Sequence, residues 1–355
     1  MRRFREHLLT IPPYASARDE FEGEARVYLD ANENPYVATW SEEAFFRYPD
    51  PHHKALREGI ARYLGLSATE ILCGCGSDEI IDWLIRVTCE PHTDAILTVE
   101  PSYGVYETYA RIHGAKVQKV RLEKDFTLRA ETVLSAITPH TRLIFLCSPN
   151  NPTGNVFSSE AIERILQTFE GWVVIDEAYG DFSEDPARWV RERSKYENLI
   201  LLRTFSKAWG LAGWRVGYAV APADLVSLFY RTKLPYNLSM PAQQAALQAL
   251  SRQEAMRQII SQIRSERTRL FQALRKIPLV RQVFPSEANF LLVRFAHSAK
   301  QIYEKLLEQG IVTRYRGSLP LCEETIRVTI GTPEENNAFL SALCAISSLI
   351  ATEPS

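Results

Sequence analysis

A lysine, Lys207, stands among apolar and small residues in the segment Arg203–Gly217. Two hydroxyl side chains, Thr204 and Ser206, precede it, and Arg215 follows eight residues later. Most lysines are solvated surface residues. Near cationic neighbours and away from water, however, a lysine amine loses its proton readily and becomes a nucleophile that forms imines. This segment therefore predicts a reactive amine beside groups that bind an anion.

A carboxylate, Asp176, ends an apolar run that is followed by Glu177, Ala178 and Tyr179. Burying an aspartate is costly unless it meets a cation or a metal ion. A metal site formed by Asp176 and Glu177 is disfavoured, because neighbouring residues of a strand point to opposite faces. The expected partner of Asp176 is a cationic group in a cleft.

The loop Ser148–Gly154 is unusually constrained for a connection between two elements. Two of its seven residues are prolines, which fix the backbone, and Asn151 can present an amide donor. A simple turn would not need seven such residues. We interpret this loop as one that holds a polar group in place for a ligand.

The segment Gly74–Glu79 leaves an expected strand and opens an expected helix, Ile80–Val87. Free backbone N–H groups and the helix dipole favour an anion at such a position, and Ser77 adds a hydroxyl. Glu79 stands where a dinucleotide fingerprint would have its third glycine, so a dinucleotide is disfavoured. A turn glycine with Ser77 as the helix N-cap is an equally good interpretation of this segment alone.

These four segments together supply what pyridoxal 5′-phosphate needs. Its aldehyde needs an amine such as Lys207, and its ring nitrogen needs a carboxylate such as Asp176 to stay protonated. Its O3′ oxygen needs donors such as Asn151 and Tyr179, and its phosphate needs an anion-binding cradle. The residues therefore predict a pyridoxal-phosphate enzyme.

The elements that carry these segments are short apolar runs that alternate with stretches of helical spacing. The expected strands are Ile71–Cys73, Ala95–Val99, Leu143–Cys147, Trp172–Asp176, Leu199–Leu202 and Val216–Val220. The alternation predicts an α/β fold with a mostly parallel sheet covered by helices. In such sheets ligands bind at the carboxyl ends of the strands, so the four segments are expected to meet in one site.

From about Leu238 the pattern changes to a long helix, expected from Pro241 to about Arg275, followed by strands and helices of a smaller α+β unit. We therefore expect a large domain over residues 45–235 and a small domain over residues 236–355. Residues 1–44 contain Pro12-Pro13 and are expected to form an arm that contributes to the small domain and to a dimer.

Composition excludes several classes of function. The chain has 355 residues, and 41 Lys and Arg against 43 Asp and Glu give a formal net charge of −2. With 46% hydrophobic and 24% charged residues it is typical of a soluble globular protein. The balanced charge argues against nucleic-acid partners and against binding to an anionic membrane.

The expected location is the cytoplasm. Only Leu8 and Leu9 follow the basic N-terminus before polar residues and prolines, which is too short for a signal peptide, and no run of 18 apolar residues occurs. Six cysteines in 355 residues fit a reducing compartment.

No metal site is expected. Cys73 and Cys75 lack a second ligand pair at the usual spacing, and adjacent histidines such as His52 and His53 rarely bind one ion. We interpret the two histidines as structural or solvent-exposed.

The motifs, in this order, resemble the fold-type-I pyridoxal-phosphate aminotransferases of class II and, within them, the histidinol-phosphate aminotransferases. The resemblance extends over nearly the whole chain, from Leu9–Tyr14 and Asn32–Pro35 to Phe284–Phe290 and Ile326–Gly331. It implies a fold with a large domain on a mostly parallel sheet and a smaller α+β domain.

The resemblance also implies roles for individual residues. Lys207 would hold the cofactor as a Schiff base and shuttle a proton, assisted by Asp176 at the ring nitrogen and by Tyr179 and Asn151 at O3′. Tyr103 would stack on the cofactor ring. The remaining cofactor-binding residues would be Gly76, Ser77, Asp78, Ala178, Thr204, Ser206, Arg215 and, from the neighbouring subunit of a homodimer, Tyr48.

For substrate, the resemblance implies that Arg327 binds the carboxylate of glutamate or 2-oxoglutarate and the phosphate of histidinol phosphate. Arg314, Tyr14 and Asn151 would assist it. A solvated charge beside Arg316 is the alternative interpretation of Arg314. The expected reaction exchanges an amino group between L-histidinol phosphate and 2-oxoglutarate in histidine biosynthesis, and gives imidazole acetol phosphate and glutamate.

Three alternatives share some of these motifs. An aromatic amino-acid aminotransferase or an enzyme like threonine-phosphate decarboxylase would use the same cofactor site. A cofactor-binding transcriptional regulator would need a DNA-binding segment, and the residues before the expected core contain no basic helix-turn-helix pattern.

Overall fold

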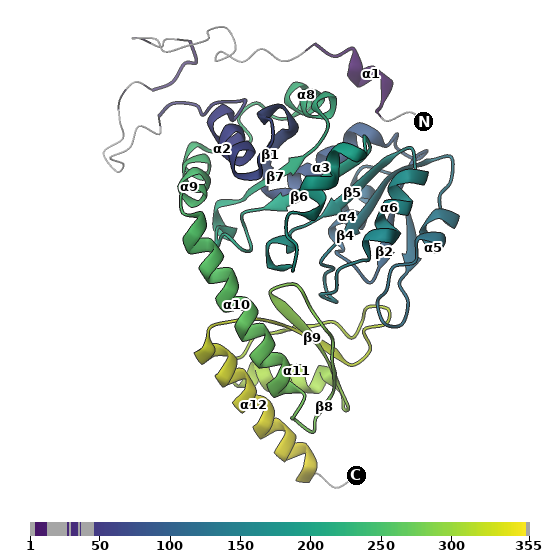
Figure 1. The fold of residues 1–355 in the computed structure, drawn as a ribbon, viewed down its shortest axis with the longest axis vertical. Helices are drawn as coiled ribbons and strands as arrows, with labels where there is room; N and C mark the ends of the chain where they lie inside the picture. The colour runs from purple at the N-terminus through teal and green to yellow at the C-terminus, as the bar shows by residue number, and fades with distance from the viewer. Residues whose placement is uncertain (1–3, 13–26, 28–29, 35, 37–45, 353–355) are drawn as a thin grey trace.

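The apolar runs of the first two thirds of the chain form one seven-stranded sheet in the computed structural model, which describes residues 4–12, 27, 30–34, 36 and 46–352 (Figure 1). The strand order is β1-β7-β6-β5-β4-β2-β3. Their bounds are β1 Ile71–Cys75, β2 Ala95–Glu100, β3 Lys116–Arg121, β4 Thr141–Cys147, β5 Trp172–Asp176, β6 Leu199–Thr204 and β7 Val216–Val220. Within this sheet β7 runs opposite to the other six strands, which are parallel to one another. The expected mostly parallel sheet is confirmed.

Helices cover both faces of this sheet because the central strands are apolar on both sides. Along β5, Val173 and Ile175 pack into one core and Trp172 and Val174 into the other, as the two-residue period of a strand requires. The first core is closed by α2 Lys54–Leu64, α5 Ala130–Ser135, α6 Ser159–Thr168 and α9 Met240–Leu250. The second is closed by α3 Gly76–Thr88, α4 Val105–Ile112 and α8 Ala223–Thr232. A short helix, α7 Arg188–Glu192, precedes β6.

The smaller α+β unit is also confirmed. Its antiparallel sheet has the order β10-β11-β9-β8, with β8 Val280–Val283, β9 Phe290–Phe295, β10 Arg314–Tyr315 and β11 Thr325–Thr329. The helices around it are α10 Gln253–Leu274, α11 Ala299–Glu308 and α12 Pro333–Thr352. A third apolar core fills the space between this sheet and these helices.

Three expected strands are one or two residues longer in the structure, β2, β4 and β6, and two other differences matter more. The single helix expected from Pro241 is two helices, α9 and α10, because the chain leaves helical geometry at Arg252, where φ is −113° and ψ is 35°. The strand expected to end at Cys73 runs on to Cys75, so α3 begins at Gly76. The second difference places the helix N-terminus directly at the end of the sheet.

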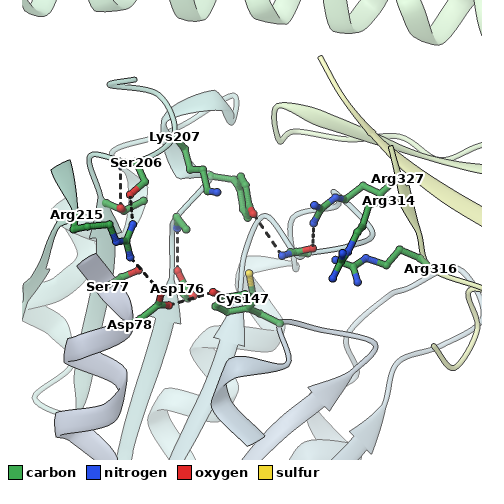
Figure 2. Close-up of a pocket in the computed structure, with 15 residues that line it drawn as sticks. Ser77, Asp78, Cys147, Asp176, Ser206, Lys207, Arg215, Arg314, Arg316 and Arg327 are labelled. Carbon is green, nitrogen blue, oxygen red and sulfur yellow. Dashed lines mark hydrogen bonds and ion pairs between the residues drawn. The ribbon is translucent and has the colours of Figure 1, made fainter. Parts of the chain in front are cut away.

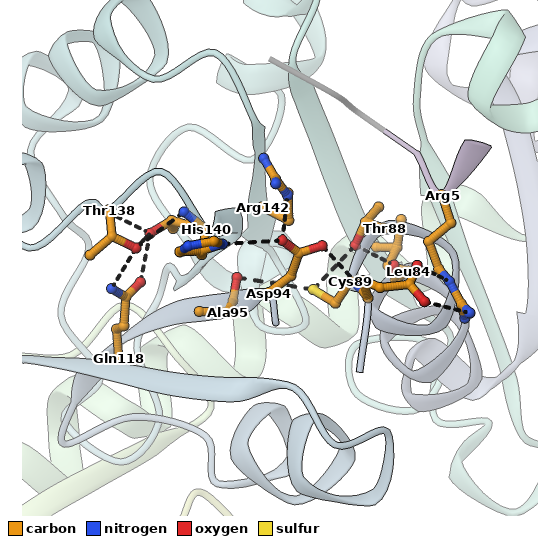
Figure 3. Close-up of polar contacts among 12 residues, drawn as sticks. Arg5, Leu84, Thr88, Cys89, Asp94, Ala95, Gln118, Thr138, His140 and Arg142 are labelled. Carbon is orange, nitrogen blue, oxygen red and sulfur yellow. Dashed lines mark hydrogen bonds and ion pairs between the residues drawn. The ribbon is translucent and has the colours of Figure 1, made fainter. Parts of the chain in front are cut away.

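The described N-terminal residues contact the large sheet. These residues, 4–12, include the short helix α1 Glu6–Leu9, and the next described residue is 27. Phe4 packs against Trp172 with ring centroids 5.7 Å apart, and the Arg5 guanidinium donates to Glu90 at 3.0 Å (Figure 3). The expected contributions of residues 1–44 to the small domain and to a dimer stay predictions.

A buried ion pair closes the amino-terminal end of the large sheet, opposite the strand ends that carry the motifs. Asp94 is fully buried just before β2, and the Arg142 guanidinium donates to it at 2.9 Å (Figure 3). The backbone N–H of Glu90 also donates to Asp94, at 2.8 Å. Within the part of the chain that the structure describes, no helix has the length and apolar character needed to cross a membrane.

Candidate active site

A cavity of about 410 Å³ lies at the carboxyl ends of the central strands, where the small sheet faces the large one (Figure 2). The large sheet provides most of its walls, and β10 and β11 provide arginines. The structure brings together in it these predicted residues: Ser77, Asp78, Tyr103, Asn151, Asp176, Ala178, Tyr179, Thr204, Ser206, Lys207, Arg215, Arg314 and Arg327.

Lys207 follows β6 and its side chain extends into the cavity (Figure 2). Partial removal of the Lys207 ammonium from water lowers its pKa, and the positive charges of Arg327 and Arg215 lower it further. The negative charges of Asp78 and Asp176 act in the opposite direction. The Lys207 Nζ lies 5.7 Å from the centre of the Tyr179 ring. The amine is therefore easier to deprotonate than an ordinary lysine.

Asp176 ends β5 with 2% of its surface exposed. The Tyr106 hydroxyl donates to its Oδ2 at 2.6 Å, and the Ala178 backbone N–H donates to its Oδ1 at 3.0 Å. No cationic side chain of the described residues pairs with it within 4 Å. Burial raises the pKa of Asp176 to about 6, and a cation beside it would reverse that effect.

A chain of hydrogen bonds joins the small sheet to the loop after β4. The Arg327 guanidinium on β11 donates to Asn151 Oδ1 at 2.6 Å, and Asn151 Nδ2 donates to the Tyr179 hydroxyl oxygen at 3.4 Å. The Arg327 guanidinium also lies 5.1 Å from the centre of the Phe290 ring. These contacts fix an amide and a phenol on the same side of the cavity as the arginines.

The opposite end of the cavity is an anion-binding arrangement at the start of α3. Gly217 on β7 is needed there, because a Cβ at this position would lie 2.2 Å from the Ser77 backbone nitrogen. The Arg215 guanidinium donates to Ser206 Oγ at 3.4 Å and pairs with Asp78 at 3.5 Å. Backbone N–H groups at a helix N-terminus, hydroxyls and a guanidinium together suit a phosphate group.

Around this end, Thr204 accepts a hydrogen bond from the Ser206 backbone N–H at 3.1 Å. The Tyr103 hydroxyl donates to Asp78 Oδ1 at 3.2 Å. Gly76 begins α3 with a φ of 76°, and a Cβ there would lie 2.5 Å from the Arg215 guanidinium, so the glycine lets Arg215 approach the helix.

Three residues at the site were not predicted from the sequence. Cys147 and Arg316 line the cavity, and Tyr106 donates to Asp176 from α4. Tyr106 lies three residues after Tyr103, a helical spacing that would place both on one face. Arg316 and Arg314 are two residues apart, which would place both on one face of a strand.

Of the predicted residues that the structure describes, Gly76 and Tyr48 do not line this cavity. Tyr48 is 49% exposed and stacks on Tyr236 with ring centroids 4.4 Å apart. Tyr14 lies outside the described residues. Of the two histidines, His53 is fully buried with its Nδ1 3.3 Å from the Tyr230 hydroxyl, and burial lowers its pKa to about 3, so its ring is neutral at pH 7.

The arrangement combines an amine of lowered pKa, a buried carboxylate with no paired cation among the described residues, and anion-binding groups at both ends of one cavity. An amine of this kind attacks carbonyl carbon, and the carboxylate can stabilise a positive charge held at the centre of the cavity. The cavity is therefore suited to a carbonyl compound that carries an anionic group and a cationic ring.

Comparison with known proteins identifies close relatives. A family model described as aminotransferase class I and II matches residues 27–343. The histidinol-phosphate aminotransferase of Parabacteroides distasonis is 44% identical over 339 residues, which cover 96% of this chain and 96% of that protein. The histidinol-phosphate aminotransferase of Cytophaga hutchinsonii is 42% identical over 339 residues, which cover 96% and 97%.

Solved structures agree with these relatives. The crystal structure of the histidinol-phosphate aminotransferase from Clostridium acetobutylicum matches with a TM-score of 0.80 and 29% identity, covering 85% of this chain and 91% of that one. That of the Sinorhizobium meliloti histidinol-phosphate aminotransferase in complex with pyridoxal 5′-phosphate matches with a TM-score of 0.79 and 26% identity, covering 86% and 84%. The fold expected from the sequence motifs is confirmed by these matches.

Proposed function

This chain belongs to the class I and II aminotransferases, and from that premise we propose that it exchanges an amino group between L-histidinol phosphate and 2-oxoglutarate with bound pyridoxal 5′-phosphate. The products are imidazole acetol phosphate and glutamate, and the reaction belongs to histidine biosynthesis in the cytoplasm. One observation carries the proposal: in the part of the chain that the structure describes, a single cavity holds an amine of lowered pKa, a buried carboxylate without a paired cation, and anion-binding groups at both ends.

The residues of the cavity fit pyridoxal phosphate. Buried Asp176 has two hydrogen-bond donors but no paired cation among the described residues, and a protonated pyridine nitrogen is the cation that its position calls for. The start of α3 supplies backbone N–H groups for a phosphate, and Gly217 leaves room for them. When bound, the cofactor supplies an electron sink that stabilises negative charge at the substrate Cα.

Each side chain of the cavity then has a task. Asp176 holds the proton on the pyridine nitrogen, with the Tyr106 hydroxyl keeping the carboxylate ionised. Tyr179 and Asn151 would donate to O3′, and Tyr103 and Ala178, which line the same cavity, would contact the cofactor ring. The phosphate is bound by Ser77, Thr204, Ser206, Arg215 and the first backbone N–H groups of α3, including those of Gly76 and Asp78.

Lys207 serves as the base and acid of the reaction. Its lowered pKa makes the amine easier to deprotonate than an ordinary lysine, so it would accept the proton that leaves the substrate Cα and pass it on to C4′ of the bound cofactor.

Recognition of substrate rests on the arginines of the small sheet. Arg327 and Arg314 bind the phosphate of histidinol phosphate in one half-reaction and a carboxylate of 2-oxoglutarate in the other, because a guanidinium binds either anion through paired hydrogen bonds. Tyr14 assists in the same pocket. The functional unit is a homodimer in which Tyr48 reaches the cofactor phosphate of the neighbouring subunit.

The proposal is tested by a half-reaction without an amino acceptor. The purified protein with its visible cofactor band is mixed with histidinol phosphate, phenylalanine or threonine phosphate in separate cuvettes. We expect histidinol phosphate at low concentration to convert the band to the pyridoxamine form, and phenylalanine to react far more slowly. A faster reaction with phenylalanine, or release of carbon dioxide from threonine phosphate, would contradict the substrate assignment.

The role of Lys207 is tested by Lys207→Ala. This variant is expected to lose the visible absorption of the bound cofactor and all turnover, because no other amine is placed at the cavity centre by the described residues. Lys276→Ala, at an exposed lysine after α10, is the matched control and should keep both. Retained transamination in Lys207→Ala would refute the assignment.

A further inference from the structure

Arg316 extends the row of arginines along the small sheet. The Arg316 backbone N–H donates to the Thr325 carbonyl at 3.0 Å, which continues the pairing of β10 with β11 by one residue. In that pairing Arg314 stands directly opposite Arg327. Because alternate residues of a strand share a face, Arg316 lies on the same face as Arg314, and Figure 2 shows the three guanidinium groups together at one end of the cavity.

The three guanidinium groups have no carboxylate to balance them. Within the described residues, none of the three forms an ion pair within 4 Å with an aspartate or glutamate. Among the described residues, the side chains that act most on the charge of Arg316 are Arg327, Arg314, Cys322 and Tyr179, and none of these four is a carboxylate. Burial and the two arginines lower the pKa of Arg316 to about 10, so it stays charged at neutral pH.

The Nε atom of Arg316 is also a buried donor without a hydrogen-bond partner in the described structure. Like charges side by side on adjacent strands destabilise a sheet, and a buried donor without a partner adds to that cost. An anion with several acceptor oxygens bound there would offset both costs. One guanidinium can satisfy a carboxylate, whereas a phosphate monoester offers three terminal oxygens and up to two negative charges.

We propose that Arg316 is a specificity-determining residue that makes this end of the cavity select a doubly charged phosphate head group over a carboxylate or an uncharged group. The inference rests on the proposed function and extends it to a residue with its own measurable effect. Arg327 and Arg314 suffice for the single charge of a carboxylate. Arg316 supplies the third cation and the additional donors that a phosphate dianion uses.

The test compares two substrates that differ only in the phosphate, histidinol phosphate and histidinol. The measured quantity is the ratio of their kcat/KM values in the holoenzyme, for wild type, Arg316→Gln, Arg316→Lys and the control Arg281→Gln. Arg281 is an exposed residue of β8 in the same sheet, so its substitution makes the same change in net charge outside the cavity.

We expect Arg316→Gln to lower the ratio by about 10- to 100-fold, the loss typical of a hydrogen bond to a charged group. Arg316→Lys keeps the charge but not the paired donors, so its ratio should lie between those of wild type and Arg316→Gln. The ratio of Arg281→Gln should match that of wild type. The Gln variant removes an unbalanced charge, so we expect it to unfold at a temperature no lower than wild type. If Arg316→Gln fails to fold, the test uses Arg316→Lys: a ratio below that of wild type supports the inference, and an unchanged ratio overturns it.

A pH series separates a role in charge selection from a structural one. The second proton of a phosphate monoester leaves near pH 6. In wild type the ratio should therefore rise with pH through about 6, and in Arg316→Gln this rise should be flattened, while enzyme groups common to both substrates cancel. An unchanged ratio and pH profile in Arg316→Gln would overturn the inference. A wild-type enzyme that does not react with histidinol phosphate would overturn the proposed function instead.

Discussion

Replacing Asp176 with asparagine should stabilise the cofactor-free protein at neutral pH. Burial raises the pKa of this carboxyl from its ordinary value of 3.8 to about 6. Between these two pH values the folded protein holds a proton that the unfolded chain has released. The free energy of unfolding therefore falls as the pH rises from about 4 to about 6, by at most about 1.4 kcal/mol per pH unit, and the loss is complete above pH 6.

The size of the effect follows from the two pKa values. A difference of about 2 pH units at 1.36 kcal/mol each corresponds to about 3 kcal/mol. Asparagine has the same shape and no charge, and its amide can keep contacts with the Tyr106 hydroxyl and the Ala178 N–H. Asp176→Asn should accordingly be about 3 kcal/mol more stable than wild type at pH 7 and about equal to it near pH 4.

The assay is equilibrium urea unfolding of the cofactor-free proteins, followed by tryptophan fluorescence between pH 4 and pH 7.5. Other groups titrate in both proteins, so the difference between them isolates residue 176. Asp94→Asn is the matched control, because Asp94 is equally buried but pairs with Arg142 at 2.9 Å. It should be less stable than wild type across this pH range, since it removes the negative charge that pairs with the partly buried Arg142 guanidinium.

Two results would refute this reasoning: a stability difference that does not vary with pH, or an Asp176→Asn protein less stable than wild type at pH 7. Saturating pyridoxal phosphate should reverse the order of the two proteins. Wild type gains a cation beside its carboxylate and so binds the cofactor more tightly, and ligand binding adds to the free energy of unfolding.

Two further substitutions test the surroundings of the same site. Gly217→Ala places a Cβ 2.2 Å from the Ser77 backbone nitrogen, so it should displace the start of α3. We expect cofactor binding, measured by spectroscopic titration, to weaken at least tenfold. Gly213→Ala is the control and should leave binding unchanged, because open space surrounds its Cβ. Tyr106→Phe removes a donor 2.6 Å from Asp176, so the pKa of that carboxyl should rise further and cofactor affinity should fall about tenfold or more. A Tyr106→Phe protein with unchanged affinity between pH 6 and pH 8 would show that the hydroxyl does not support the charge.

The strand ends that carry chemistry could be predicted from the sequence because residue type and position agree there. Burying Asp176 at the end of an apolar strand is costly without a partner, Lys207 stands among small and apolar residues, and the structure puts both in one cavity. The alternation of strands and helices likewise predicts the parallel sheet, because parallel strands need a covering helix between them.

The remaining parts of the site depend on pairing between distant segments. Strand β10 has two residues, which is too short for a periodic pattern, so the position of Arg316 follows only from its pairing with β11. The sequence around Tyr106 predicts only a core aromatic residue, and the fold brings its hydroxyl oxygen to 2.6 Å from Asp176 Oδ2. The break between α9 and α10 carries no proline or glycine, so the sequence gives no local signal for it.

Helix α10 belongs to two hydrophobic cores at once. Near its beginning Met256 and Ile260 pack with the large sheet, and near its end Leu270 and Leu274 pack with the small one. Ile263 between them touches both cores. A helix of 22 residues spans about 33 Å, so it acts as a continuous strut across the molecule. Neither core can unfold without exposing part of this helix, so the unfolding of the two units is expected to be cooperative. The helix, rather than a flexible linker, also sets the distance between the two sheets and hence the width of the cavity between them.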